Sequence, residues 1–209
     1  MNKRCKIIIA VVLILALAVA GIFYYNKAQE DKMGPVSFES FKRIEADGKV
    51  FMENKDIGLK FEVPEGWEVE NLVWSAISMA SQDFEAFTDE SPLPKKGCLI
   101  NINPEIQVQG SDYDLQYTSL EQRIDSNDCL MFGDYEKEKC EIVDFSGVKG
   151  IKDSLFIDSN LNNQGDYINV SIPNNNVVYR FETYIFGENK DSCLEDFNQF
   201  LTTISIKKK

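Results

Sequence analysis

The sequence predicts an α+β domain, with a central antiparallel sheet of about six strands and flanking helices, preceded by one N-terminal transmembrane helix. Three observations predict this class. Short segments in which apolar and polar residues alternate recur after residue 48, as in strands with one buried face. Two sequences typical of helix N-termini precede apolar residues at helical spacing. One run of 19 residues near the N-terminus carries no charge.

The strand predictions begin in the first third of the chain. Residues 59–63 alternate apolar and polar side chains, which predicts a half-buried strand. The following Pro64-Glu65-Gly66 predicts a turn, because proline presets φ and glycine accepts a positive φ. Residues 72–80 are apolar and fit a strand or a helix by periodicity alone. Alternation over residues 98–103 predicts a further strand.

A hairpin is predicted in the C-terminal third. Residues 167–172 and 177–186 are rich in β-branched and aromatic side chains, and they flank Pro173-Asn174-Asn175-Asn176. Asparagine tolerates a positive φ, so this tetrapeptide predicts the turn of the hairpin. Residues 141–145 and 150–157 predict two more strands.

Two capping boxes predict the helices. Ser119-Leu120-Glu121-Gln122 has the S-x-x-Q form, which predicts a short helix ending near Asn127. Ser192-Cys193-Leu194-Glu195 predicts a second helix, which should pack on the sheet near Trp67. A closing strand is expected at residues 204–206. The second helix carries an apolar stripe at helical spacing: Leu194, Phe197, Phe200 and Leu201.

The uncharged run spans residues 7–25. At about 1.5 Å per residue it would be roughly 28 Å long as a helix, close to the thickness of a hydrocarbon core. Lys3, Arg4 and Lys6 precede it, so the positive-inside rule places that end in the cytoplasm. The alternative is a signal peptide cleaved after Ala20. The run continues past that site, which favours an uncleaved anchor.

The domain organisation follows from this anchor. Residues 1–6 are predicted to be cytoplasmic, and residues 7–25 to be the transmembrane signal anchor or signal peptide. Residues 26–47 are polar and predict a stalk. Residues 48–209 predict one extracytoplasmic domain. The expected location is therefore the cell membrane, with a single pass and the C-terminal domain outside.

Charge restricts the partners of that domain. The chain has 22 Lys and Arg against 34 Asp and Glu, and after residue 25 the balance is 19 cations against 34 acids, or −15. Such a domain repels nucleic acid, so apart from the membrane contact of residues 7–25 we expect a basic protein or a cationic ligand. The chain has no histidine, which excludes Ser-His-Asp and Cys-His catalysis and histidine metal sites.

Four cysteines follow the predicted anchor: Cys98, Cys129, Cys140 and Cys193. In an oxidising compartment they allow three pairings, which the sequence does not distinguish, and buried free thiols are the alternative. A bond between Cys129 and Cys140 would tie the end of the first helix to the next strand. None of the spacings is C-x-x-C, so zinc and thioredoxin-like sites are not indicated.

One segment has the start of a calcium loop. Asp158, Asn160 and Asn162 place oxygen atoms at alternate positions. The sixth position is Asn163, where an EF-hand needs glycine, and the twelfth is Asn169, where it needs glutamate. These three residues are therefore weak metal candidates, and a polar connection before the last hairpin is favoured.

The two tryptophans are the aromatic candidates for binding. Trp67 and Trp74 have side chains suited to stacking on a sugar or a peptide. Trp67 directly follows a Pro-x-Gly turn and Trp74 lies in an apolar run, so a place in the core is the favoured interpretation of both.

Three segments carry a family resemblance: GLKFEVPEGWEVE at residues 58–70, VWSAISMASQDFE at residues 73–85, and VVYRFETYIF at residues 177–186 followed by CLEDFNQFLTTISI at residues 193–206. Over residues 49–206 the order of elements resembles the PsbP-like family. The resemblance implies a central antiparallel sheet with helices packed on it, and a mostly noncatalytic domain. It transfers no functional residue, and it implies no cofactor.

The function expected from these observations is a membrane-anchored extracytoplasmic binding or scaffold domain without catalytic or cofactor-binding residues. Two alternatives remain: an exported hydrolase that uses paired carboxylates, and an adhesion or sensing module that depends on a divalent cation. Two carboxylates in a deep pocket would favour the first alternative. Three convergent oxygens near Asp158 would favour the second.

Overall fold

The computed structural model describes residues 17, 19–21, 34–71, 75–85, 96–107, 112–127, 138–145, 147–159, 163–186 and 190–207. The chain divides into two compact units, Met1–Gly34 and Pro35–Lys209. In the first unit residues 17 and 19–21 are helical, and Leu17 and Val19 are exposed. Within the described part of the chain no helix has both the length and the apolar character needed to cross a membrane. Most of the predicted anchor, residues 7–25, lies outside the described residues.

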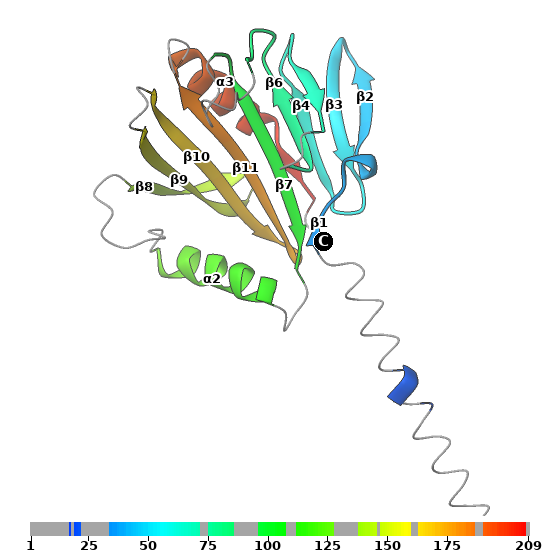
Figure 1. Cartoon of the computed structure of the whole chain (residues 1–209). Helices are drawn as coiled ribbons and strands as arrows, with labels where there is room; N and C mark the ends of the chain where they lie inside the picture. The colour runs from blue at the N-terminus through cyan, green and yellow to red at the C-terminus, as the bar shows by residue number, and fades with distance from the viewer. Residues whose placement is uncertain are drawn as a thin grey trace, which may run out of the picture. The chain divides into compact units, whose positions relative to one another are not determined.

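The second unit contains two antiparallel sheets, sheet A and sheet B (Figure 1). In spatial order, sheet A runs through β5 (Glu68–Glu70), β6 (Ile77–Ala80), β7 (Leu99–Ile106), β11 (Val177–Phe186), β10 (Asn163–Asn174), β9 (Val148–Ser159) and β8 (Glu138–Phe145). Sheet B runs through β12 (Ser205–Ile206), β4 (Leu59–Val63), β3 (Lys49–Asn54) and β2 (Lys42–Ala46). The two-residue strand β1 (Gly34–Pro35) comes first in the chain.

The prediction of one sheet with about six strands is therefore corrected to two sheets. Alternation identifies a strand and its buried face, but it does not say which strands pair. The predicted stalk is also too long, because η1 (Phe38–Ser40) and β2 lie within residues 26–47. β2 and β3 form a hairpin around Asp47 and Gly48, whose φ angles are 54° and 75°. An Asp-Gly pair with two positive φ angles is a type I′ turn, a signal that the sequence contained.

The hairpin predicted for residues 167–186 is confirmed. β10 and β11 pair from Gly165 with Phe186 to Asn174 with Val177. The turn residues Asn175 and Asn176 have φ angles of 53° and 62°, as a two-residue type I′ turn requires. The ambiguous segment 72–80 contains a strand, β6, in its second half.

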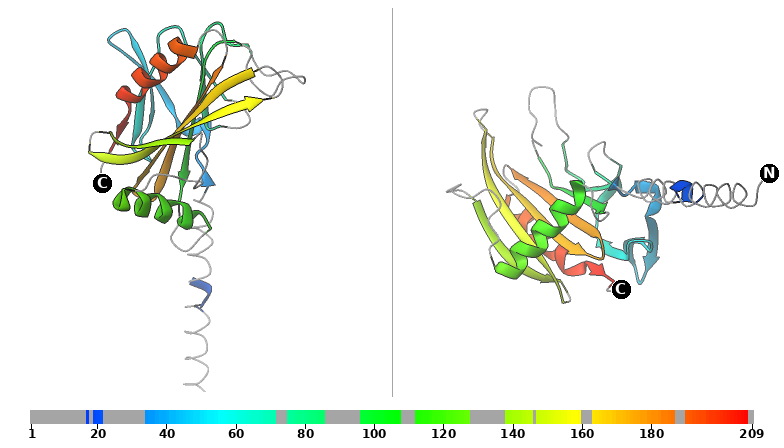
Figure 2. Two further views of the ribbon diagram at one scale, coloured as in Figure 1. Left: turned by 90° about the vertical axis from the view of Figure 1, so that its left-hand side faces the viewer. Right: turned by 90° about the horizontal axis from the view of Figure 1, so that it is seen from below.

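Two helices cover opposite faces of sheet A (Figure 2). α3 (Lys190–Thr203) packs between the inner face of sheet A and sheet B. α2 (Asp112–Ser126) covers one end of the outer face. Both helices begin before their predicted capping boxes, so Ser119 and Ser192 are not N-caps. Polar residues ahead of each box continue the helix, and the S-x-x-Q or S-x-x-E pattern is compatible with a helix interior.

The core confirms the predicted packing of the second helix. Phe197, Phe200 and Leu201 are buried, and Leu194 is half-buried. The Phe200 ring lies 5.7 Å from that of Phe61 in β4 and 5.9 Å from that of Phe181 in β11, centroid to centroid. One aromatic side chain therefore joins both sheets through α3, in the tilted geometry that aromatic pairs prefer.

Candidate functional site

A turn between the two sheets positions the aromatic group of the candidate site. β4 ends at Val63, and the N–H of Trp67 donates to the carbonyl of Pro64 at 3.1 Å. Gly66 has a φ of 79°, which the third residue of a type II turn needs. The turn presents the Trp67 side chain half-buried, with part of it packed against the main core cluster.

One face of α3 lies opposite this turn. Asp196, Gln199, Phe200 and Thr203 follow the i, i+3, i+4, i+7 spacing that places side chains on one helix face. The hydroxyl of Thr203 donates to the carbonyl of Phe200 at 2.8 Å and accepts the N–H of Glu62 at 3.2 Å. These two bonds fix the end of α3 against β4.

A cleft of about 750 Å³ lies between sheet B, the Pro64–Trp67 turn and α3, and we call it the Trp67 cleft. Its volume is within the range of small-molecule sites. Its apolar lining includes Val50, Val63, Trp67 and Phe200, and its charged lining consists of Arg43, Lys49, Glu62, Glu65 and Asp196. The sequence placed Trp67 in the core, and the structure places it both against the core and in a cleft wall.

The charges of the Trp67 cleft differ in how they are paired. The ammonium of Lys49 lies 2.9 Å from the carboxylate of Glu62, and the guanidinium of Arg43 lies 3.4 Å from that of Glu45. The side-chain carboxylates of Glu65, which is exposed, and Asp196, which is half-buried, make no ion pair or hydrogen bond with the described residues. The cations of the cleft are thus neutralised locally, whereas two of its carboxylates are not.

Asp196 is the cleft carboxylate with a perturbed proton affinity. Burial raises its pKa above the usual 3.8, and the neighbouring negative charge of Glu195 raises it further. Both causes disfavour the ionised form, so a positive charge brought into the cleft would be stabilised beside Asp196.

A second cleft, of about 560 Å³, lies on the other side of α3. Its floor is formed by Ile168, Ile185 and Leu194, and its charged groups are Lys139, Glu141, Lys152 and Asp166. Lys152 lies 3.4 Å from Glu141 and donates to Asn198 at 3.2 Å, and Asp166 lies 2.6 Å from Lys190. Most of its charges are already satisfied within the protein, which makes it the weaker candidate.

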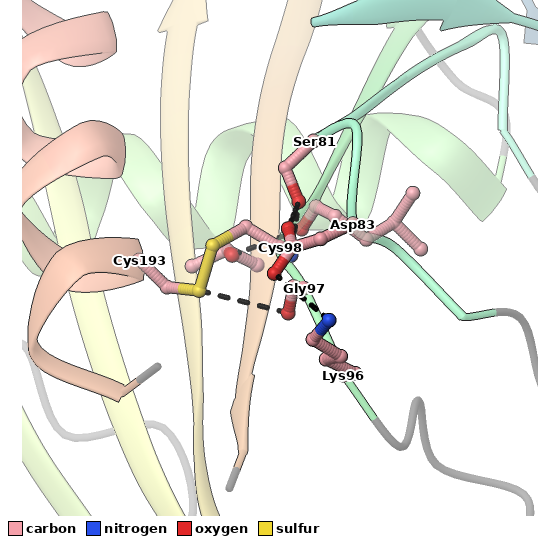
Figure 3. Close-up of a disulfide and its surroundings, with 8 residues drawn as sticks. Ser81, Asp83, Lys96, Gly97, Cys98 and Cys193 are labelled. Atoms are coloured by element: carbon pink, nitrogen blue, oxygen red, sulfur yellow. Dashed lines mark hydrogen bonds and ion pairs between the residues drawn. A yellow bond between two sulfur atoms is a disulfide. The ribbon is translucent and has the colours of Figure 1, made fainter. Parts of the chain in front are cut away.

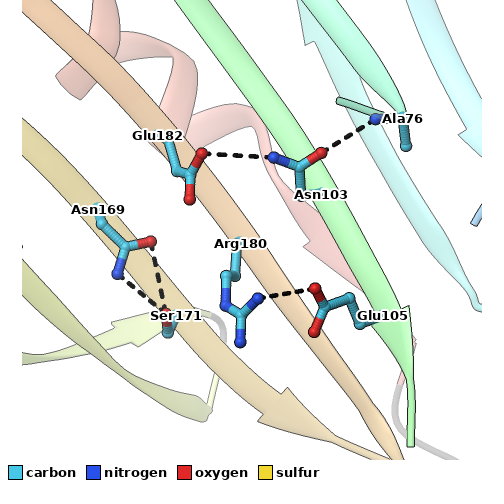
Figure 4. Close-up of polar contacts among 7 residues, drawn as sticks. All are labelled: Ala76, Asn103, Glu105, Asn169, Ser171, Arg180 and Glu182. Atoms are coloured by element: carbon cyan, nitrogen blue, oxygen red, sulfur yellow. Dashed lines mark hydrogen bonds and ion pairs between the residues drawn. The ribbon is translucent and has the colours of Figure 1, made fainter. Parts of the chain in front are cut away.

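A polar network occupies the outer face of sheet A (Figure 4). Arg180 donates to Glu105 at 2.8 Å, and the Asn103 amide donates to Glu182 at 3.3 Å. The Asn103 oxygen accepts the N–H of Ala76 at 3.0 Å. These polar groups hydrogen-bond to one another across β7, β11 and the segment before β6. The network therefore holds the strands in register and leaves few polar groups free to bind a ligand.

Tyr167 belongs to the same outer face. Burial raises the pKa of its phenol far above the usual 10, and the negative charge of Glu182 and a hydrogen bond with Glu182 add to the effect. Burial and Glu182 also raise the pKa of Tyr184, whose ring centroid lies 5.0 Å from that of Tyr167. Both phenols therefore stay protonated at neutral pH and are unsuited to act as bases.

The structure resolves part of the cysteine question. Cys98 and Cys193 form a disulfide with a Cα–Cα distance of 5.5 Å, joining the start of β7 to the first turn of α3 (Figure 3). The N–H of Cys98 donates to the Ser81 hydroxyl at 2.8 Å. Of the three pairings, only the one with Cys129 bonded to Cys140 is compatible with this bond. Cys140 is disulfide-bonded, and Cys129 lies outside the described residues, so that pair stays a prediction.

The calcium-loop candidates are only partly described. The backbone of Asp158 lies in β9 and pairs with Gln164, so the strand extends into the predicted polar connection. Asn160, Asn162 and the second tryptophan, Trp74, lie outside the described residues. Within the described part of the chain no three acidic or cysteine side chains gather as a metal site.

Comparison with known proteins finds a distant likeness to solved structures. No family model and no curated protein sequence matches the chain. Among solved structures, it is similar to cyanobacterial PsbP (CyanoP) from Synechocystis sp. PCC 6803, with 11% identity over 80% of this chain and 93% of that one and a TM-score of 0.40. It is also similar to LpqN of Mycobacterium tuberculosis, involved in cell envelope biogenesis, with 10% identity, coverage of 79% and 90%, and a TM-score of 0.41.

A third similar structure is the Ran-binding protein Mog1p of Saccharomyces cerevisiae, with 11% identity, coverage of 80% and 96%, and a TM-score of 0.38. A PsbP is thus among the structures to which the chain is similar, in line with the resemblance stated from the sequence. At such identities and scores the likeness concerns the fold alone, so the site is argued from this chain's own residues.

Proposed function

We propose that this protein is a membrane-anchored, extracytoplasmic binding domain whose binding site is the Trp67 cleft. The observation that carries the proposal is the combination of a half-exposed aromatic wall with two carboxylates, Glu65 and Asp196, that have no partner in the described structure. Glu65 is exposed and Asp196 is half-buried, so both carboxylates are accessible to a ligand that enters a cleft with an aromatic wall.

The membrane anchor is supported by the sequence. Residues 7–25 carry no charge and follow three cations. Protease added to intact spheroplasts should digest the domain. Protection of the domain until the membrane is lysed would reverse the proposed orientation.

The absence of histidine supports a noncatalytic role. Histidine is absent, so an enzyme of this sequence would have to use carboxylates or a nucleophile without a histidine base. The cleft does contain carboxylates, and Asp196 has a raised pKa, which a general acid needs. A carboxylate hydrolase is therefore the second candidate function.

The test compares the full-length protein with Trp67→Ala and Asp196→Asn, in detergent, for retention of partners from extracytoplasmic extract and for turnover in a broad hydrolase screen. The proposal predicts that both variants lose partners and that no preparation shows turnover. Asp191→Asn, on the same helix and exposed, is the matched charge control. Turnover lost in Asp196→Asn but kept in the control would instead establish the hydrolase.

A further inference from the structure

We propose that the Trp67 cleft binds the cationic side chain of a lysine or arginine in a basic segment of a partner protein. This inference rests on the proposed function and names the ligand class of the same site. Three features of the cleft carry it: the imbalance of paired and unpaired charges, the aromatic wall, and the apolar surfaces beside that wall.

The charge imbalance selects the sign of the ligand. Lys49 is paired with Glu62 and Arg43 with Glu45, so the positive charge of each is offset within the protein. Glu65 and Asp196 face the same space without a partner in the described structure. A cation that enters the cleft is attracted by both carboxylates and can form a charge-assisted hydrogen bond, whereas an anion would be repelled by both.

The aromatic wall selects the kind of cation. Ammonium and guanidinium groups are attracted to the face of tryptophan more than to other aromatic side chains. A hydrated metal ion gains little from such a wall, and it needs several converging oxygens, which the described residues do not provide. Trp67 together with two carboxylates therefore fits an organic cation.

The apolar surfaces fit the remainder of a lysine or arginine side chain. Val50, Val63 and Phe200 line the cleft beside Trp67. The methylene stem of a lysine or arginine packs on such surface while its charged head reaches polar groups. Beyond the cleft, the surplus of 15 negative charges after residue 25 attracts a segment that carries further cations.

The experiment measures binding of defined probes to the full-length protein in detergent micelles, by calorimetry and by tryptophan fluorescence. The probes are N-acetylated, C-amidated pentapeptides with lysine, arginine, glutamine or glutamate at the centre, a basic nonapeptide, and spermidine. We expect the lysine, arginine and basic peptides to bind, and the glutamine and glutamate peptides to show no binding. Affinity should fall as salt rises, because exposed charges are screened.

Variants locate the binding. Glu65→Gln and Asp196→Asn should each weaken binding of the basic peptide about fivefold, the effect expected for one partly exposed charge pair. The matched controls Glu68→Gln and Asp191→Asn remove one exposed negative charge outside the cleft and should stay within about twofold. Trp67→Phe should keep part of the affinity that Trp67→Ala loses, because phenylalanine retains an aromatic face.

A loss of stability is not expected to explain weaker binding by the Asp196→Asn variant. The pKa of Asp196 is raised in the folded protein, so its contribution to stability is full below about 3.8 and is lost as pH rises through the folded value. Asp196→Asn therefore leaves the protein at least as stable at neutral pH, which urea unfolding checks. A weakened affinity in this variant then reports the lost charge.

Each outcome decides one point. If the glutamine peptide binds as tightly as the lysine peptide, the inference of a cationic ligand is wrong. If spermidine binds as tightly as the basic nonapeptide, the inference that the ligand belongs to a partner protein is wrong. If no probe binds while Trp67→Ala still loses partners from extract, the ligand class is wrong and the proposed site stands. If the Trp67 and Asp196 variants keep all their partners, the proposed function itself fails.

Discussion

The two faces of sheet A are stabilised in different ways. On β11 the side chains of Tyr179, Phe181 and Ile185 point inward and are almost fully buried against α3 and sheet B. The alternate residues Arg180 and Glu182 point outward and remain half-exposed in a hydrogen-bonded network. The same strand thus contributes dispersion and apolar burial on one side and directional polar pairs on the other.

Part of the outer face is covered by α2. Leu120 and Ile124 of α2 form a small separate cluster with Ile151 of β9 and Val178 of β11. An ion pair between Arg123 and Asp153 crosses the same contact, with 3.7 Å between the groups. The comparison teaches that the inner face carries the stability of the fold, whereas the outer face adds a small second core and strand register.

The largest expected effect is on the inner face. Phe197→Ala should lower the free energy of unfolding by about 3–5 kcal/mol, because the ring is fully buried and its removal leaves a cavity. Urea unfolding of the Pro35–Lys209 unit measures the change. A loss below about 1 kcal/mol would show that α3 is not docked as described.

A smaller effect is expected under α2. Leu120→Ala should cost about 2–3 kcal/mol, the lower part of the range for buried leucines, since its cluster is small and lies at an edge. The exposed neighbour Glu121→Ala is the control and should change stability by less than about 0.5 kcal/mol. A loss for Leu120→Ala equal to that for Phe197→Ala would remove the distinction between the two faces.

The polar network should contribute less per pair. A double-mutant cycle of Glu105→Gln and Arg180→Met should give a coupling energy of about 0.5–1 kcal/mol, because both side chains are partly exposed and screened. A coupling above about 2 kcal/mol would mean that the outer face carries stability comparable to the core.

The smallest effect appears only at high pH. The raised pKa of Tyr167 means that above pH 10 the unfolded chain loses a phenol proton that the folded protein keeps. This contribution to stability is full below about 10 and is lost as pH rises toward the folded value. Tyr167→Phe should flatten the decline of stability above pH 10, followed by urea unfolding. An unchanged slope would mean that the phenol is solvated.

Local features of this fold were predictable from the sequence. The hairpin turn within Pro173–Asn176 and the buried stripe of α3 depend on neighbouring residues, so the sequence pattern alone predicted them. The division into two sheets was not predictable, because β4 pairs with β12 across more than 140 residues of chain. Pairing at that distance depends on the docking of α3.

The candidate site was predictable only in part. The sequence marked Trp67 as a possible stacking residue, but its exposure depends on where α3 lies. Asp196 gave no sequence signal, because one acid in an acidic helix is unremarkable until the fold places it beside Trp67. The cleft thus depends on the long-range contact between the Pro64–Trp67 turn and α3, and no local sequence pattern indicated that α3 would form its second wall.

The Cys98–Cys193 bond also determines how the chain would respond to pulling. The two cysteines are 95 residues apart, so β7, α2 and β8 to β11 lie within one covalent loop. A force applied between the two ends of the chain passes across the sulfur–sulfur bond and bypasses that loop. Roughly 330 Å of chain, at about 3.5 Å per residue, would remain unextended until the bond is reduced. Under tension the oxidised domain would release only its flanking segments, including all of sheet B, while most of sheet A stays on a short tether.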